Sequence, residues 1–322
     1  MKALAELNRS FREIELKEVK KPRIWKEKEL LNGKVANVMV IVLRTPGCYW
    51  AKVSGCSMCG YFKETYDAGY DEIKKQIDEA YKKYEGEEIV KFFTSGSFLD
   101  EKEMPRDLQI YAIEKFSKAK KIVIESRPEF IKNLEWLQGN IEVAMGLESA
   151  NDRVLEYSIN KGFRFRAWLK NAKLVKKHGK KLRVYILIKP PFLKEIEAIK
   201  DAINSARKVA NIADVISFNP VAIHGKTIVE TLWNRHLYRP PWLWSVVQVI
   251  KETKKFYDGM IKCDVVARGM ARGAHNCGKC DKKILHAIEE FNLKQDEKIF
   301  DGIDCDCREE WLDFLELEEY MI

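Results

Sequence analysis

Six short apolar segments alternate with amphipathic segments along the first two thirds of the chain, and this alternation constrains the fold more than any other feature. The first apolar segment, 35–43, reads VANVMVIVL, a β-branched run typical of a strand buried on both faces. Strand–helix alternation predicts a parallel sheet with right-handed crossovers, either open or closed into a full or partial barrel. The expected strands are 35–43, 88–94, 121–125, 141–147, 182–188 and 213–218.

The segments between these strands are rich in Lys and Glu and have helical spacing of their apolar residues. The alternation ends after about residue 225, and residues 231–244 are dense in Trp, Arg, His and Pro. We therefore expect an N-terminal helical extension (1–34), a barrel (35–234) and a C-terminal Cys-rich extension (235–322). The expected helices are 71–84, 106–119, 129–136, 165–178, 194–209, 245–256 and 283–291.

Composition bounds the class of protein. Of the 322 residues, 46% are hydrophobic and 33% charged, which allows a sizeable core and excludes bulk disorder. No apolar run approaches the roughly 18–20 residues that span a bilayer. The first 28 residues lack the apolar core of a signal peptide. We expect a soluble, cytoplasmic protein with no membrane partner.

The charge is unevenly distributed. The whole chain has 57 basic and 49 acidic residues, yet residues 281–322 contain 14 acidic and only 5 basic ones. The preceding body is therefore strongly basic, which indicates a polyanionic partner such as RNA. A Lys- and Glu-rich surface of the kind found in thermophiles is the alternative explanation.

Three of the eight cysteines, Cys48, Cys56 and Cys59, follow the first expected strand in the loop RTPGCYWAKVSGCSMCGY. The carboxyl end of a parallel strand is the functional face of such folds. Three thiolates suit a [4Fe–4S] cluster that leaves one iron open, and the glycines let the loop wrap closely around it. A zinc site is the alternative, but it requires a fourth ligand that is not near in the sequence.

The motif TPGCYWAKVSGCSMCGY, with ESRPEF and MGLES further on, resembles the radical S-adenosylmethionine (SAM) superfamily. The usual spacing there is C-x3-C-x2-C, whereas seven residues separate the first two cysteines here. The longer pattern is similar to the archaeal RaSEA family, the radical SAM subunits of archaeosine synthase and relatives of the catalytic subunit of Elongator. The resemblance extends to NCGKC and DCDC near the end of the chain. It implies an α/β fold, an incomplete (β/α)6 TIM-like radical SAM barrel with a C-terminal metal-bearing extension, and cluster ligation by the three cysteines.

The resemblance also implies a SAM site at the ends of the next three expected strands. The loop that meets the methionine amine is Ser95-Gly96-Ser97, which lacks the usual acidic residue. Arg127 offers a bidentate grip for the SAM carboxylate, and Glu148 offers an acceptor for the ribose hydroxyls. A salt bridge or a strand-end cap is the alternative for each. The full expected set is Met58, Ser95, Gly96, Ser97, Glu125, Arg127, Glu148 and Ser149.

Candidate substrate contacts lie on the last strand ends and in a basic loop. Lys189, His224 and Lys226 should face the barrel mouth, and Arg268 and Arg272 lie in a Gly-bearing basic loop. The nearby cationic and aromatic side chains offer phosphate contacts and stacking faces for bases, although such aromatics also pack cores. These neighbours are Arg235, His236, Tyr238, Arg239, Trp242 and Trp244.

Two further cysteine pairs, Cys277–Cys280 and Cys305–Cys307, enclose 24 residues with an expected helix. Four thiolates at this spacing favour a structural zinc ion. An auxiliary [4Fe–4S] cluster would use the same four residues. His275 or Cys263 can replace one of the ligands. The remaining alternative is four unrelated reduced cysteines.

The resemblance implies a radical SAM lyase that acts on tRNA. Its substrate would be the lysine adduct of 7-cyano-7-deazaguanine in the tRNA D-loop (position 15), and C–N cleavage would leave archaeosine. The implied partners are tRNA, the lysine-transferring synthase subunit and an external electron donor. The acidic tail is a candidate docking surface for the lysine-transferring subunit. The alternatives are another radical SAM tRNA-modifying enzyme, or a non-catalytic iron–sulfur or zinc RNA-binding adaptor.

Overall fold

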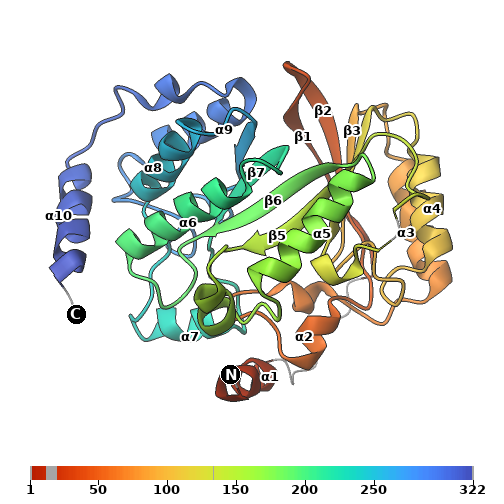
Figure 1. Cartoon of the computed structure of the whole chain (residues 1–322), viewed down its shortest axis with the longest axis horizontal. Coiled ribbons are helices and arrows are strands. Elements are labelled where there is room, and N and C mark those ends of the chain that lie inside the picture. Colours follow the sequence, from red (N-terminus) through yellow and green to blue (C-terminus); the bar gives the residue numbers. More distant parts are fainter. Residues whose placement is uncertain (1, 12–19, 133, 321–322) are drawn as a thin grey trace.

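A computed structural model describes residues 2–11, 20–132 and 134–320 of the chain. Within these residues, one eight-stranded sheet runs in sequence order from β1 to β8 and curls into a partial barrel (Figure 1). Strands β2 to β8 are parallel, whereas β1 pairs with β2 in antiparallel fashion. The strands are β1 (Arg23–Leu31), β2 (Lys34–Val42), β3 (Ile89–Phe93), β4 (Lys121–Ser126), β5 (Ile141–Glu148), β6 (Lys181–Ile188), β7 (Val215–Pro220) and β8 (Met260–Cys263).

Helices cover the outer face of the sheet, and smaller helices lie at one end of it (Figure 1). The covering helices are α3 (Tyr70–Tyr81), α4 (Arg106–Lys115), α5 (Phe165–Lys177), α6 (Glu195–Val209), α8 (Leu243–Lys254) and α9 (Asp281–Lys294). The remaining α-helices of the described residues are α1 (Lys2–Ser10), α2 (Tyr49–Val53), α7 (Ile228–Asn234) and α10 (Cys307–Tyr320). Because α9 contacts both β1 and β8, it bridges the two edge strands of the open barrel.

Strand β2 shows why the parallel strands are apolar throughout. Met39 and Ile41 belong to the large core between sheet and helices, whereas Val38 and Val40 pack in a separate cluster on the opposite, inner face. All four side chains are fully buried. Burial on both faces is the reason that the sequence reads as a continuous apolar run.

At the amino-terminal ends of the parallel strands, the inner face of the barrel is ionic. Glu29 of β1 is buried and accepts from cations on four other strands: Lys91 at 2.6 Å, Lys121 at 3.0 Å, Arg183 at 2.6 Å and Lys262 at 3.3 Å. Removing one member of such a network would leave a buried charge unpaired, which typically costs about 3–5 kcal/mol. These ion pairs hold the antiparallel first strand to the rest of the sheet.

The expected partial barrel with a cysteine-bearing C-terminal region is confirmed, and it has two more strands than expected. The expected helical extension was wrong over Arg23–Leu31, which is strand β1. The Lys- and Glu-rich sequence of this segment resembles the exposed surface of a helix. Its inward carboxylates are instead paired with cations that lie far along the chain, which no local pattern shows. The sheet also continues past the boundary expected at residue 234, because β8 pairs with β7.

The helix expected at 129–136 was wrong. The structure has only a 3-10 turn at Pro128–Phe130, followed by irregular chain over the described residues up to β5. Ile131, Leu134 and Leu137 are buried at intervals of three, a spacing that imitates helical periodicity. The crossover from β4 to β5 therefore buries its apolar residues without forming an α-helix.

Candidate functional site

The three N-terminal cysteines lie in a loop between β2 and the 3-10 helix that begins at Tyr61. Cys56 is buried and Cys48 and Cys59 are partly buried, so the loop packs against the body. Gly47 has a φ of +79°, and a Cβ there would lie 2.5 Å from the side chain of Thr65. Glycine is therefore required for the loop to turn at this point.

The Thr94–Ser97 loop after β3 packs directly on Cys48. A Cβ on Gly96 would lie 2.7 Å from Cys48 Cα and 2.8 Å from its backbone nitrogen. The loop is folded by its own hydroxyl, because the Gly96 N–H donates to Thr94 Oγ1 at 3.2 Å. The structure thus brings two elements together that the sequence assigned to the cluster and to SAM.

Glu103 supplies the carboxylate that the Ser95–Ser97 loop lacks in its own sequence. It is buried and accepts from the Ser97 N–H and from the Thr45 hydroxyl, each at 2.6 Å. Burial raises the pKa of Glu103 to about 6, although these hydrogen bonds oppose the rise. Sequence reasoning missed this residue, because it lies six positions beyond Ser97 and returns to the loop only through a turn.

Two cations lie beside the cysteine loop. Arg127 donates to Glu129 at 2.6 Å and to the Lys161 carbonyl oxygen at 2.9 Å. Burial raises the pKa of the Cys48 thiol, and the Arg127 guanidinium opposes that rise. Burial lowers the pKa of Lys161, but Glu148 and Cys56 outweigh it and the net pKa is raised. Cys48 and Cys56 therefore lie in a cationic setting, and the three thiols of the loop are a donor set that fits an anionic iron–sulfur centre.

Glu148 is displayed at a break in β5. The register shifts between Gly146 and Glu148, and Glu148 has a φ of +71°, which is unusual for a residue with a side chain. Its carboxylate pairs with Lys161 at 2.6 Å, and a Cβ on Gly146 would lie 2.5 Å from that carboxylate. The backbone distortion and the absent side chain of Gly146 together make room for this ion pair.

Glu125 points into the barrel near its mouth, on the same side of the sheet as Tyr185 of β6. Burial raises the pKa of Glu125 to about 7, the neighbouring Glu148 carboxylate adds to the rise, and a hydrogen bond with Tyr185 opposes it. The carboxyl group is therefore poised to be neutral or ionised near neutral pH.

Two other expected cofactor residues have different surroundings. Met58 packs beside the buried Cys56 cluster, with its sulfur 4.0 Å from the Ser57 hydroxyl. Ser149 is fully buried and its hydroxyl donates to Asp201 of α6 at 2.9 Å, so its hydrogen bond is with a covering helix.

Of the expected substrate contacts, His224 packs against the end of the cysteine loop. A Cβ on Gly60 would lie 2.5 Å from that of His224, and the Tyr61 ring meets the imidazole edge to face at 5.0 Å. Lys226 is exposed. Lys189 is buried and pairs with Glu195 at 2.6 Å, so its charge is already compensated.

The basic loop and its aromatic neighbours are largely engaged in internal contacts. Arg268 pairs with Glu289, and Arg272 pairs with Glu230 at 2.5 Å. Tyr238 and Trp244 are buried, so they do not offer stacking faces to bases.

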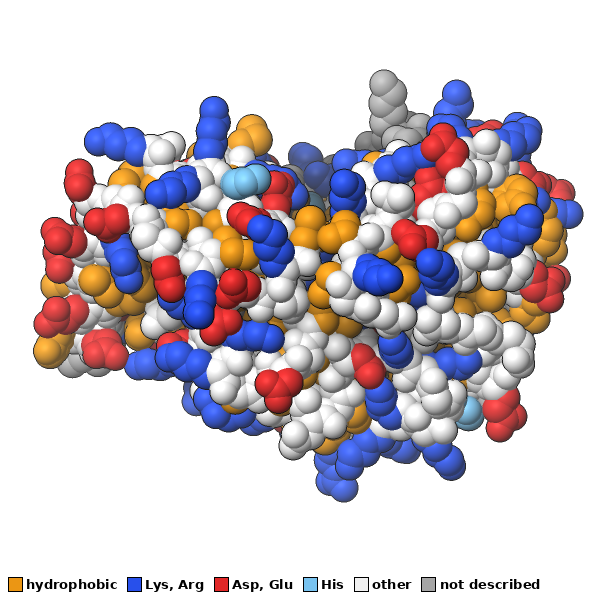
Figure 2. All heavy atoms as spheres, turned by 90° about the horizontal axis from the view of Figure 1, so that it is seen from above, with side chains coloured by type: hydrophobic (Ala, Val, Ile, Leu, Met, Phe, Trp, Pro, Cys, Tyr) orange, Lys and Arg blue, Asp and Glu red, His pale blue; other side chains and the backbone are white. Residues whose placement is uncertain are grey.

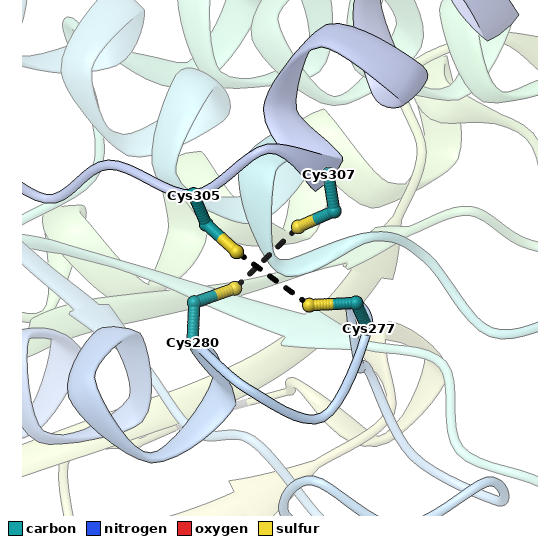
Figure 3. A group of neighbouring side chains, drawn as sticks. All are labelled: Cys277, Cys280, Cys305 and Cys307. Atoms are coloured by element: carbon teal, nitrogen blue, oxygen red, sulfur yellow. Dashed lines mark hydrogen bonds between the residues drawn. The ribbon is translucent and has the colours of Figure 1, made fainter.

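The four C-terminal cysteines converge at one point (Figure 3). Their sulfur atoms all lie within 4.8 Å of one another, and the Cys277–Cys305 and Cys280–Cys307 pairs are 3.6 Å apart. A single tetrahedral ion with metal–sulfur bonds of about 2.3 Å places its sulfurs about 3.8 Å apart. The group therefore fits one metal ion.

Surrounding groups complete this second centre. The indole N–H of Trp244 donates to Cys307 at 3.4 Å, and the Asn276 amide donates to Cys280 at 3.3 Å. Such donors stabilise thiolate ligands. Cys263 lies in β8 and His275 bonds to the Gly273 carbonyl, and neither belongs to the group.

The fold and its cysteine loop match a known family. Residues 42–203 match the model of the radical SAM superfamily. Two solved structures share the fold. The first is archaeal Methanocaldococcus infernus Elp3 with an N-terminal deletion, with a TM-score of 0.50 and 15% identity over 73% of this chain and 60% of that one. The second is methylornithine synthase PylB, with a TM-score of 0.52 and 17% identity over 72% of this chain and 66% of that one. The chain belongs to the radical SAM superfamily. Membership of this superfamily implies a [4Fe–4S] cluster and SAM as cofactors.

Curated relatives narrow the family further. The chain is 35% identical over 314 residues to archaeosine synthase subunit beta of Methanosarcina acetivorans, covering 92% of this chain and 90% of the relative. It is 37% identical over 309 residues to archaeosine synthase subunit beta of Thermococcus kodakarensis, covering 89% and 94%. Within the superfamily, the chain belongs to the archaeosine synthase subunit beta family, as its cysteine motif indicated. Among the described residues, no helix is long and apolar enough to cross a bilayer.

Proposed function

We propose that this chain is the radical SAM lyase subunit of an archaeosine synthase. Its substrate is a tRNA whose 7-cyano-7-deazaguanine at D-loop position 15 carries a lysine adduct. Cleavage of a C–N bond releases the lysine remnant and leaves the formamidine of archaeosine. The observation that carries the proposal is the near full-length similarity to two proteins named archaeosine synthase subunit beta. A cytoplasmic location, where tRNA is found, belongs to the same proposal.

The residues of the barrel mouth hold the cofactors in this proposal. Cys48, Cys56 and Cys59 would each hold one iron, and the bound cluster and SAM would supply a 5′-deoxyadenosyl radical for hydrogen abstraction from the substrate. An external donor provides the electron. The protein positions the groups and excludes water.

The SAM contacts follow from the same arrangement. The Thr94–Ser97 loop lies against Cys48, which supports a role for its carbonyl and hydroxyl oxygens as acceptors from the methionine ammonium. Arg127 lies beside the cysteines and receives the carboxylate, and Glu148 receives the ribose hydroxyls. His224 and Lys226 face the substrate. Tests of Arg127 must allow for Glu129, which already occupies part of its guanidinium.

Anaerobic reconstitution with adduct-bearing tRNA tests the function. Wild-type protein should convert the adduct to archaeosine and form 5′-deoxyadenosine, both measured by mass analysis of nucleosides and small molecules. Formation of 5′-deoxyadenosine without archaeosine would indicate another radical SAM reaction. If neither product forms in reconstituted protein, the chain is an RNA-binding adaptor instead.

We also propose that the second centre holds zinc. A cubane cluster binds each cysteine sulfur on a different iron, so its sulfurs lie farther apart than the ligands of one ion. The four sulfurs all lie within 4.8 Å of one another, which favours one ion. Cys280 directly precedes α9 and Cys307 begins α10, so the ion ties the starts of two helices together.

The surface of α10 supports a docking site for a partner subunit. Its inner side packs on α6 and α8 through Trp311 and Leu315, whereas Leu312 (51% exposed) and Leu317 (64% exposed) face solvent. Figure 2 shows acidic side chains among hydrophobic ones at the left edge of the molecule, where α10 lies in Figure 1. We propose that the lysine-transferring subunit docks here with a basic, apolar surface. Changing Leu312 and Leu317 to Ser should reduce co-purification with that subunit and leave uncoupled SAM cleavage unchanged.

A further inference from the structure

The loop that connects β6 to α6 displays an aromatic ring on a strained backbone. It reads Lys189-Pro-Pro-Phe192-Leu193, and Lys189 and Phe192 have φ values of +60° and +69°. Positive φ is a genuine outlier for a bulky residue and persists only where the surroundings enforce it. The Lys189 carbonyl accepts from the Tyr238 hydroxyl at 2.6 Å, and the Pro191 carbonyl accepts from the Ser158 hydroxyl. Held in this way, Phe192 is 56% exposed.

A second exposed ring lies beside this loop. Residues Val154–Ile159 form a π-helix, a rare element that is frequent at functional sites. Within it, Tyr157 is 59% exposed. Because the neighbouring Ser158 bonds to Pro191, the backbones that carry Tyr157 and Phe192 are held side by side.

Both elements are attached to the cysteine loop. The Ser158 carbonyl accepts from the Ser57 hydroxyl at 2.6 Å, and Ser57 lies between Cys56 and Met58. At the end of the π-helix, the Asn160 amide donates to the Gly55 carbonyl at 2.7 Å. The segments that carry the two exposed rings are therefore hydrogen-bonded to the cysteine loop, the π-helix directly and the 189–193 loop through Ser158.

The rings border two adjoining grooves. A groove of about 1040 Å³ includes both Tyr157 and Phe192, and a second of about 740 Å³ shares Phe192 and Leu193 with it. The walls carry more basic than acidic side chains, and the larger groove is flanked by exposed cations. These cations are Arg153, Arg166, Lys200, Arg207 and Lys208.

We propose that Tyr157 and Phe192 form a stacking platform for unpaired bases of the RNA substrate, with the strand's phosphates along the basic groove. Exposed aromatic rings beside cations are the arrangement that binds single-stranded nucleic acid. A base held unpaired suits chemistry on a nucleobase, which must leave the stack to be reached. The inference rests on the proposed function, because it takes tRNA as the substrate.

Binding of an unmodified tRNA transcript to anaerobically reconstituted protein tests the platform. Tyr157→Ala and Phe192→Ala should each weaken the affinity about tenfold, and the double variant more. Tyr157→Phe and Phe192→Tyr keep a ring and should bind like wild type. Tyr70→Ala removes a ring that is 43% exposed on α3 and serves as the matched control. Cluster absorption and 5′-deoxyadenosine formed without tRNA should be unchanged in all variants.

The outcomes separate the two proposals. If wild type binds the transcript and both Ala variants bind it equally well, the platform is wrong and the proposed function stands. If the Ala variants lose the partner subunit but keep tRNA affinity, the rings are a protein contact and the platform is again wrong. If wild type itself does not bind the transcript, the platform is wrong, and archaeosine formation on adduct-bearing tRNA decides the proposed function separately.

Discussion

The two cysteine groups differ in how far the protein alone assembles them. The four C-terminal sulfurs already lie within 4.8 Å of one another and receive N–H donors from Trp244 and Asn276. The three N-terminal cysteines lie in a glycine-bearing loop at the barrel mouth, beside a strand-end loop and two cations. A closed set of four ligands stabilises a fold, whereas an open set of three leaves room for an exogenous ligand. The difference predicts that one centre serves stability and the other chemistry.

The largest expected effect is at the open centre. Cys56→Ala should abolish both the iron–sulfur absorption and 5′-deoxyadenosine formation, a loss of at least about a thousandfold, because two thiolates hold a cluster poorly. Absorption spectra and product analysis under anaerobic reduction measure it. Cys263→Ala, in the buried β8 cysteine outside both groups, is the control and should keep the cluster. Full activity in Cys56→Ala would remove the ligand assignment.

The closed centre should respond with stability instead of chemistry. Cys280→Ala should destabilise the C-terminal region by several kcal/mol, because a structural metal stabilises the fold through its binding energy. The iron–sulfur absorption should stay. Elemental analysis of anaerobically purified wild type should give about four irons and one zinc. About eight irons and no zinc would show that the second centre is an auxiliary cluster and that the two groups are alike in chemistry.

The sequence predicts most of the sheet because its parallel strands are buried on both faces and read as apolar runs. It does not predict β1, whose inward Glu27 and Glu29 find their cations on distant strands. Cysteine spacing points to both cysteine groups, because the first is confined to one loop and the second consists of two close pairs. The sequence did not single out Glu103, Tyr157 or Phe192. Their positions depend on turns and on surface exposure, which no local sequence pattern encodes.

A titration should detect the polar interior of the open centre. The pKa of Glu125 is raised from 4.5 to about 7 by burial and by the neighbouring Glu148 carboxylate, against the opposing effects of Tyr185, Arg183 and Lys91. The folded state therefore binds this proton more tightly than the unfolded state, so stability is greatest below pH 4.5 and falls as the pH rises to about 7. Glu125→Gln should lack this fall.

Denaturant unfolding from pH 5 to pH 8 measures the difference. The Gln variant should gain up to about 3 kcal/mol relative to wild type across that range. Glu309→Gln, in an exposed residue of α10, is the control and should follow wild type. Parallel curves for wild type and Glu125→Gln would show that this carboxyl is ionised throughout, and the barrel mouth would then be more hydrated than its burial indicates.

The smallest expected effect tests whether Arg127 belongs to the open centre or only to the scaffold. Arg127→Ala should weaken SAM binding about tenfold with iron content intact, because the bidentate grip on the carboxylate is lost. Since Glu129 occupies the same guanidinium at 2.6 Å, Glu129→Gln should free it and tighten SAM binding severalfold. Arg106→Ala is the control. It breaks an ion pair with Glu101, a residue outside the Thr94–Ser97 loop, and should leave the affinity for SAM unchanged. Equilibrium binding of SAM to the reconstituted cluster protein measures the affinity of all three variants. Opposite changes of affinity in the Arg127 and Glu129 variants indicate a cofactor contact. If the pair is only structural, both variants should change the affinity in the same direction.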